Sequence, residues 1–181
     1  MDESTGNKAL TLHDDTWYIT NGVLENFNGN GEKVVIIPPG VTEVDISAFL
    51  LEDEIETIIV SDTVKKLEYS SFDSLDSLKT LYLPDNGLQL CPGFICNCTS
   101  LKEIYLGENK LEFVTAAYED DSEYTYLVTY AGDKSDVIVP DGYKEIGESA
   151  FRKNKNINSV ALPQGITRVD SCAFKDCDNL S

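Results

Sequence analysis

Residues 35–49, VIIPPGVTEVDISAF, decide the fold of this chain because copies of the stretch recur along it. The copies begin at positions 35, 58, 81, 104, 137 and 160, so the steps are 23, 23, 23, 33 and 23 residues. A period in this range, repeated this often, is typical of a solenoid of stacked units. The further copies are IIVSDTVKKLEYSSF (58–72), LYLPDNGLQLCPGF (81–94), IYLGENKLEFV (104–114), VIVPDGYKEIGESAF (137–151) and VALPQGITRVDSCAF (160–174).

Each copy begins with a pattern that predicts a short strand. Val35 and Ile37 are two positions apart, so their side chains point to the same side of an extended chain. The equivalent positions are aliphatic in every copy, which predicts that this side faces the core. Proline follows in four copies and ends the strand, because proline cannot donate to a sheet. The equivalent pairs are Ile58 and Val60, Leu81 and Leu83, Ile104 and Leu106, Val137 and Val139, and Val160 and Leu162.

The second half of each copy predicts a return segment and a core ring. Apolar residues three apart, such as Val41 and Val44, suit a short helical or 3₁₀ segment laid against the core. A small residue then precedes a phenylalanine, whose ring would fill the column. These pairs are Ala48-Phe49, Ser71-Phe72, Gly93-Phe94, Ala150-Phe151 and Ala173-Phe174.

Together these patterns predict an α/β solenoid with one parallel sheet of at least six strands and short helical or 3₁₀ return segments. Residues 1–16 lack the period and are expected to form a flexible tail, followed by a solenoid over residues 17–181. Residues 17–32 predict two strands joined at Asn21-Gly22, a ribbon that would cap the column. The longer step predicts an insertion at residues 115–134, with a surface loop at 116–123 and a strand at 124–130.

Composition limits the classes of partner. The chain carries 32 acidic and 14 basic residues, a formal net charge of −18, which disfavours nucleic acid and anionic lipid surfaces as partners. The charge leaves open a basic protein, a cation or a neutral glycan. The apolar runs are too short for a membrane span, so no membrane insertion is expected. Residues 1–16 are polar and acidic, so we expect no signal peptide within them.

The repeats at 137–151 and 160–180 resemble those of BspA-like leucine-rich-repeat proteins. The opening WYITNGVLENFNGNGEKVVIIPPGV, residues 17–41, also resembles the lead-in common in that group. The resemblance implies a right-handed leucine-rich-repeat superhelix with a parallel sheet on its concave side. It further implies a secreted or cell-surface bacterial protein that adheres to host or matrix proteins or to other cells. A cytoplasmic protein is the alternative location, because the chain shows no leader.

The outer face of the predicted sheet is the candidate binding surface. The residue between the two core positions of each strand points outward, and isoleucines and tyrosines dominate this row. Apolar and aromatic strips of this kind often mark a contact surface. The structural alternative is that such residues favour strands and pair across neighbouring strands. The candidate ligand-binding residues are Ile36, Ile59, Tyr82, Tyr105 and Ile138.

The residues that could support chemistry do not form a recognisable site. Cys91, Cys96 and Cys98 have C-x₄-C-x-C spacing, which is wrong for zinc, and His13 is the single histidine. A disulfide from Cys91 to Cys96 or Cys98 remains an option in a secreted protein, whereas Cys98 and Cys177 suit small apolar pockets beside the repeat phenylalanines. We therefore expect no catalytic residues, no metal ligands and no cofactor.

The function that the sequence favours is a non-catalytic binding and adhesion scaffold, not an enzyme. It would engage a protein partner, such as a host or matrix protein or another cell surface, through the concave sheet. The alternative is a structural spacer within a larger surface protein, with the apolar row covered by a neighbouring copy or domain. The oligomeric state is left open by the sequence.

Overall fold

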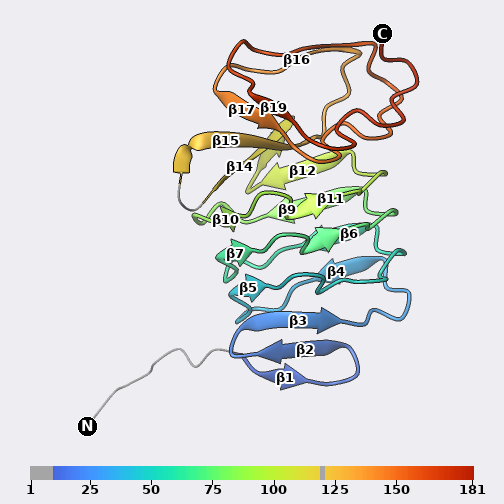
Figure 1. The fold of residues 1–181 in the computed structure, drawn as a ribbon. Helices are drawn as coiled ribbons and strands as arrows, with labels where there is room; N and C mark the ends of the chain where they lie inside the picture. Colours follow the sequence, from blue (N-terminus) through green and yellow to red (C-terminus); the bar gives the residue numbers. More distant parts are fainter. Residues whose placement is uncertain (1–9, 119–120) are drawn as a thin grey trace.

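The structure, a computed structural model, describes residues 10–118 and 121–181, whose short strands are stacked as a column (Figure 1). The expectation of a repeat solenoid is confirmed, with about six turns. Within the described residues, the backbone forms strands and turns and no helix. Accordingly, no helix in this part of the chain is long and apolar enough to cross a membrane.

The first sheet takes one strand from each of four successive coils. These strands are parallel, and each pairs with the strand 23 residues further along, so that Val35 lies opposite Ile58 and Ile58 opposite Leu81. The sequence step is therefore also the structural step. From edge to edge, the order is β4 (Val34–Ile36), β6 (Thr57–Ile59), β9 (Thr80–Leu83), β12 (Glu103–Leu106) and β13 (Asn109–Leu111).

The return segments form a second sheet, so the predicted helical or 3₁₀ returns and the α/β class were wrong. The backbone groups of these segments bond to the neighbouring coil: the Lys65 N–H donates to the Thr42 carbonyl oxygen at 2.7 Å. A partner one coil away satisfies an extended backbone better than a single isolated helical turn can. The order is β1 (Leu12–His13), β2 (Trp17–Thr20), β3 (Val23–Phe27), β5 (Glu43–Val44), β7 (Lys66–Leu67) and β10 (Gln89–Leu90).

The start of the chain extends this second sheet with antiparallel strands. β2 and β3 pair as the sequence predicts, with a turn at Asn21-Gly22 in which both residues have positive φ. β1 pairs with β2, so the regular backbone begins before residue 17. The rest of the expected tail, residues 1–9, lies outside the described residues.

The insertion is a hairpin of two longer strands, β14 (Phe113–Tyr118) and β15 (Asp121–Tyr130). The surface loop expected at residues 116–123 was therefore wrong for 116–118 and 121–123, which belong to these strands; residues 119–120 lie outside the described residues. Residues 116–118 and 121–123 continue the strands because the backbone groups of β14 and β15 pair with each other. β15 then pairs in parallel with β17 (Tyr143–Ile146), which pairs with β19 (Arg168–Val169).

β15 also separates the column into two blocks with distinct cores. Tyr126 and Val128 pack in the core of the N-terminal block, whereas Leu127 and Tyr130 pack in the core of the C-terminal block. Side chains along a strand alternate in direction, and a register shift in the pairing of β15 with β14, between Thr129 and Leu127, interrupts this alternation. One strand can therefore cover the open end of both blocks. The insertion is thus a shared wall between the blocks (Figure 1).

The first sheet ends at β13, before the C-terminal block begins. This corrects the prediction of a single sheet of at least six strands. β13 folds back on β12 through a turn at Gly107, whose φ of +57° is easily adopted by glycine, and it occupies the free edge of β12. β16 (Asp136–Ile138) therefore pairs with β18 (Ser159–Ala161) in a separate sheet. A third pairing within the N-terminal block joins β8 (Phe72–Asp73) to β11 (Ile95–Cys96).

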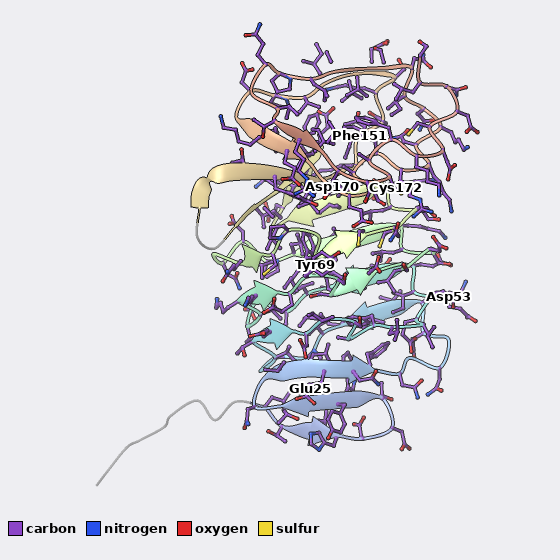
Figure 2. The ribbon with its side chains drawn as sticks, viewed as in Figure 1. Glu25, Asp53, Tyr69, Phe151, Asp170 and Cys172 are labelled. Atoms are coloured by element: carbon purple, nitrogen blue, oxygen red, sulfur yellow. The ribbon has the colours of Figure 1, made fainter. Side chains whose placement is uncertain are left out.

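The core contains a ladder of phenylalanine rings, one per coil. Successive centroids in the N-terminal block are 5.3 Å apart from Phe27 to Phe49, 5.3 Å from Phe49 to Phe72 and 6.5 Å from Phe72 to Phe94. A second ladder in the C-terminal block joins Tyr130, Phe151 and Phe174, with spacings of 5.3 and 5.0 Å; Phe151 is labelled in Figure 2. The strand positions predicted to face the core are buried in the first three coils, whereas Leu162 in the last coil is 40% exposed. Each coil therefore covers the apolar side of its neighbour.

We predict that Phe72→Ala will lower the free energy of unfolding by about 3–5 kcal/mol, because it empties a fully buried position between two other rings. Urea denaturation followed by circular dichroism measures this loss. Leu50→Ala is the control, because Leu50 is 62% exposed and its truncation should change stability little. A loss below about 1 kcal/mol for Phe72→Ala would contradict the stacked core.

A ladder of ion pairs gives a second prediction. The Glu56 carboxylate accepts from Lys79 Nζ at 2.6 Å and from Lys33 Nζ at 2.9 Å, one coil to either side. The hydrogen bonds from Lys79 and Lys33 lower the pKa of Glu56 from 4.5 to about 2. A carboxylate whose pKa is lower in the folded protein than in the unfolded chain stabilises the fold at pH values above its unfolded-state pKa. This stabilisation is lost as the pH falls through its folded-state pKa. The free energy of unfolding of wild type should therefore exceed that of Glu56→Gln near neutral pH. This difference should disappear as the pH is lowered from 4.5 to about 2. A difference that does not depend on pH would contradict the assignment.

Candidate functional site

Four of the five candidate binding residues form one row across the first sheet. The pairing register places Ile36 opposite Ile59, Ile59 opposite Tyr82, and Tyr82 opposite Tyr105. The two tyrosine rings stack with centroids 4.9 Å apart and planes 13° apart. Ile36 is 59% exposed and Tyr82 is 38% exposed, whereas the other two are half-buried. We call these four residues the strip.

Ile138, the fifth candidate, is not part of the strip. It lies in β16, opposite Ala161 of β18, in the separate sheet of the C-terminal block. The prediction that it continues the row was wrong because β13 covers the edge of β12 on which β16 would have added. Ile138 is 76% exposed.

The outward row of the second sheet has a different chemistry. Glu43 lies opposite Lys66, and Lys66 lies opposite Gln89, so polar and charged side chains occupy the row that corresponds to the strip. Strand propensity alone does not explain this contrast, since both rows lie in strands of the same coils. The apolar row is therefore a property of one face of the column.

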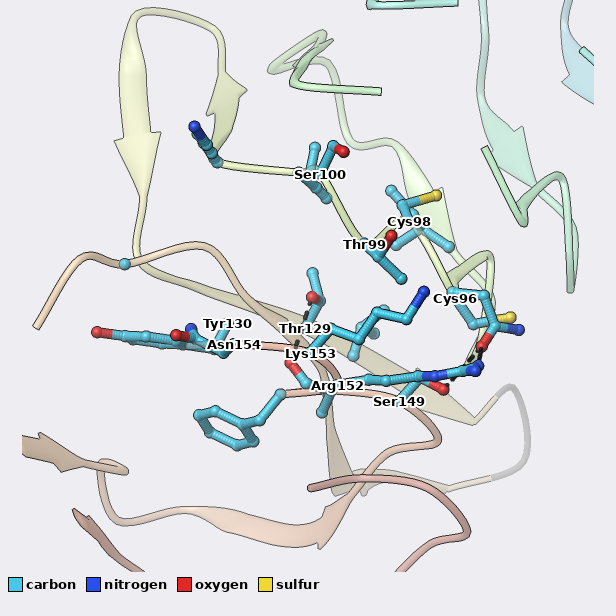
Figure 3. Close-up of a pocket in the computed structure, with 18 of the residues that line it drawn as sticks. Cys96, Cys98, Thr99, Ser100, Thr129, Tyr130, Ser149, Arg152, Lys153 and Asn154 are labelled. Atoms are coloured by element: carbon cyan, nitrogen blue, oxygen red, sulfur yellow. Dashed lines mark hydrogen bonds between the residues drawn. The ribbon is translucent and has the colours of Figure 1, made fainter. Parts of the chain in front are cut away.

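A pocket of about 570 Å³ opens where the two blocks meet (Figure 3). Thr99, Ser100 and Lys102 line it from the N-terminal block, and Arg152 and Lys153 line it from the C-terminal block. Thr129 and Tyr130 of β15 lie between the two walls. Sequence reasoning missed this pocket, because residues about fifty positions apart form its walls. The 33-residue step signalled a break in the column but not which side chains face it.

One hydrogen-bond network ties the blocks together beside this pocket. Asn97 Nδ2 donates to Asp73 Oδ1 at 3.0 Å, within the N-terminal block. Asn97 Oδ1 accepts from Ser149 Oγ at 3.0 Å and from Arg152 Nη1, both in the C-terminal block. The amide of Asn97 therefore fixes the position of the Arg152 guanidinium at the edge of the pocket.

Two of the five cysteines, Cys98 and Cys177, fill equivalent places beside the core rings, whereas Cys172 is exposed. All five are free thiols in the structure, so the disulfide considered for Cys91 is not formed. Cys98 Sγ donates to the Phe72 carbonyl oxygen at 3.1 Å, and Cys177 Sγ donates to that of Phe151 at 3.0 Å. Both thiols follow the preceding ring by 26 residues, so they fill the same slot of different coils. Burial raises the pKa of Cys98 to about 12, which keeps this thiol protonated and unreactive.

The remaining chemical groups are dispersed. His13 lies in β1, where its ring stacks on Tyr18 with centroids 4.0 Å apart and Nε2 lies 3.1 Å from Thr20 Oγ1. Across the described ranges, 10–118 and 121–181, no three His, Cys, Asp or Glu side chains gather in a group that could hold a metal ion.

Comparison with known proteins addresses the family and the fold. The sequence pattern of the BspA type leucine rich repeat region matches residues 6–125 and 125–181, in six copies. No curated protein matches the chain by sequence.

One solved structure superposes closely on the chain, and two others are less similar. A leucine rich cell surface protein from Faecalibacterium prausnitzii superposes with a TM-score of 0.71 at 21% identity, over 82% of this chain and 40% of that protein. A leucine rich repeat protein from T. pallidum gives a TM-score of 0.47 at 21% identity, over 88% of this chain and 61% of that protein. A leucine-rich repeat protein from Eubacterium ventriosum gives 0.46 at 14% identity, covering 82% and 59% of the two chains.

The chain thus spans less than two thirds of the length of each of these proteins. At these identities the first superposition supports the fold alone, while the family pattern covers nearly the whole chain. The repeat sequence and the stacked coils agree, and the chain belongs to the BspA type leucine rich repeat family.

Proposed function

We propose that this chain is a protein-binding scaffold that engages its partner through the strip on the first sheet. The leucine-rich repeats of this family are generally consistent with a protein-binding or surface repeat protein. Scaffolds of this kind are typically non-catalytic. The observation that carries the proposal is the contrast between the two sheets. Isoleucine and tyrosine face outward on the first sheet, whereas the corresponding row on the second sheet is charged and polar.

The strip has features that suit a protein contact. The stacked pair of Tyr82 and Tyr105 offers a large amphipathic surface, and tyrosine is among the residues that dominate interface energies. Glu56, with Lys33 and Lys79, lies directly before the strands that carry the strip and provides a charged border. The net charge of −18 favours a neutral or basic partner over an acidic one.

A surface location is part of the proposal. The structurally similar protein from Faecalibacterium prausnitzii is described as a cell surface protein, and the family pattern is shared along nearly the whole chain. A secreted or surface-attached adhesion module is consistent with an exposed strip that is free to meet another protein. The spacer alternative would instead bury the strip against a neighbouring copy, which light scattering detects as a stable dimer.

We expect the double variant Tyr82→Ala, Tyr105→Ala to keep its fold and to bind at least about tenfold more weakly, because truncating interface tyrosines removes hot-spot contacts. The measurement is biolayer interferometry against a panel of immobilised collagen, fibronectin and laminin. The control is Tyr18→Ala, Tyr69→Ala, which removes two tyrosines that are 45% and 50% exposed and lie outside the strip. Equal binding by both double variants and wild type would refute the use of the strip.

A further inference from the structure

The junction pocket has an excess of positive charge in an otherwise acidic protein. Five basic residues and two acidic residues, Glu103 and Asp133, line it. The whole chain has the opposite balance, 14 basic and 32 acidic residues. The basic residues of the lining are Lys102, Lys110, Arg152, Lys153 and Lys155.

Among the described residues, three of these cations have no carboxylate partner. Lys110 pairs with Glu103 at 3.0 Å, and Lys155 pairs with Asp178. Within the part of the chain that the structure describes, Lys102, Arg152 and Lys153 form no ion pair, although acidic residues outnumber basic ones more than twofold. Cations left unpaired around a shared cavity indicate a site for a negatively charged group.

Arg152 is held in place for such a role. Its Nη1 donates to Asn97 Oδ1, whereas its Nε is buried and has no hydrogen-bond partner among the described residues. Lys33, Glu56 and Lys79 alternate in charge at successive coils and form ion pairs. Lys102 takes the next position, one coil beyond Lys79, where a glutamate would have continued these pairs. Basic side chains from both blocks therefore line the same pocket, and a bound anion would offset their positive charge.

The remaining lining favours a hydroxylated ligand. Ser100 contributes a hydroxyl, and Thr99 Oγ1, which donates to Asp76 Oδ1 at 2.8 Å, can still accept a hydrogen bond. Asn154 and Asn156 contribute amides that can donate or accept. Figure 3 shows Lys153 extending toward Thr99 across the gap between the walls. The volume of about 570 Å³ lies within the range of small-molecule pockets. A long polyanion would meet the repulsive field of a protein with net charge −18, so a small ligand fits better.

We propose that the junction pocket binds a small acidic sugar, with its carboxylate at Lys102, Arg152 and Lys153 and its hydroxyls at the polar wall. This site is separate from the strip and does not depend on it. Because both blocks contribute, the bound sugar also stabilises the junction between them.

The test is isothermal titration of the intact protein with D-glucuronate, with D-glucose, acetate and sulfate as comparison ligands. We expect saturable binding of glucuronate with a Kd below about 20 mM. This Kd should be at least about tenfold lower than the Kd of each comparison ligand. The variant Lys102→Gln, Lys153→Gln should weaken glucuronate binding at least about tenfold, because both side chains are exposed and their loss leaves the fold intact. Glucuronate should also raise the melting temperature of wild type by mass action.

The matched control is the variant Lys144→Gln, Lys175→Gln, which removes two exposed lysines outside the pocket. This variant should bind glucuronate as wild type does. The strip variant should also bind glucuronate normally, which separates this proposal from the proposed function. The pocket assignment is overturned by absent binding, by equal affinity for acetate or sulfate, or by equal losses in the pocket and control variants.

Discussion

Hydrogen bonding between residues one coil apart is the constraint on which the rest of the structure depends. Strand pairing follows the 23-residue step in both sheets, as Val35 with Ile58 and Val44 with Leu67 show. The same step recurs in side-chain contacts, including Lys33 with Glu56 and Gly40 with Thr63. With no helix in the described residues, the backbone of each coil is satisfied mainly by its neighbours. A coil length that repeats is therefore a physical requirement of the column.

The insertion shows what happens when this step is broken. The ten extra residues of the 33-residue step cannot continue both sheets in register, and the chain instead folds back as β13 and as the hairpin of β14 and β15. The hairpin covers both cores, so the column continues without a wet gap in its interior. On the surface the break leaves a pocket, bridged by Asn97 and lined by charged residues that no regular coil would bring together.

The sequence predicted what depends on local periodicity. The strand at Val35, the core position of Phe72, the hairpin at Asn21-Gly22 and the strip up to Tyr105 follow from two-residue alternation and from the step. The return segments were mispredicted because Val41 and Val44 fit one turn of helix or a short strand equally well, and the deciding hydrogen bonds come from another coil. The place of Ile138 was mispredicted because β13 takes the free edge of β12, and the pocket was missed because Arg152 meets Asn97, a residue distant in sequence.

Removal of one whole coil tests the central claim most directly. Deleting residues 58–80 joins Thr57 to Leu81 and restores the register of the coils on either side, because it removes one full step of 23 residues. Urea denaturation followed by circular dichroism should show a folded, cooperatively unfolding protein for this deletion and an unfolded one for a deletion of residues 58–69. If the half-coil deletion folded as well as the whole-coil deletion, stacking in register would not be what holds the chain together.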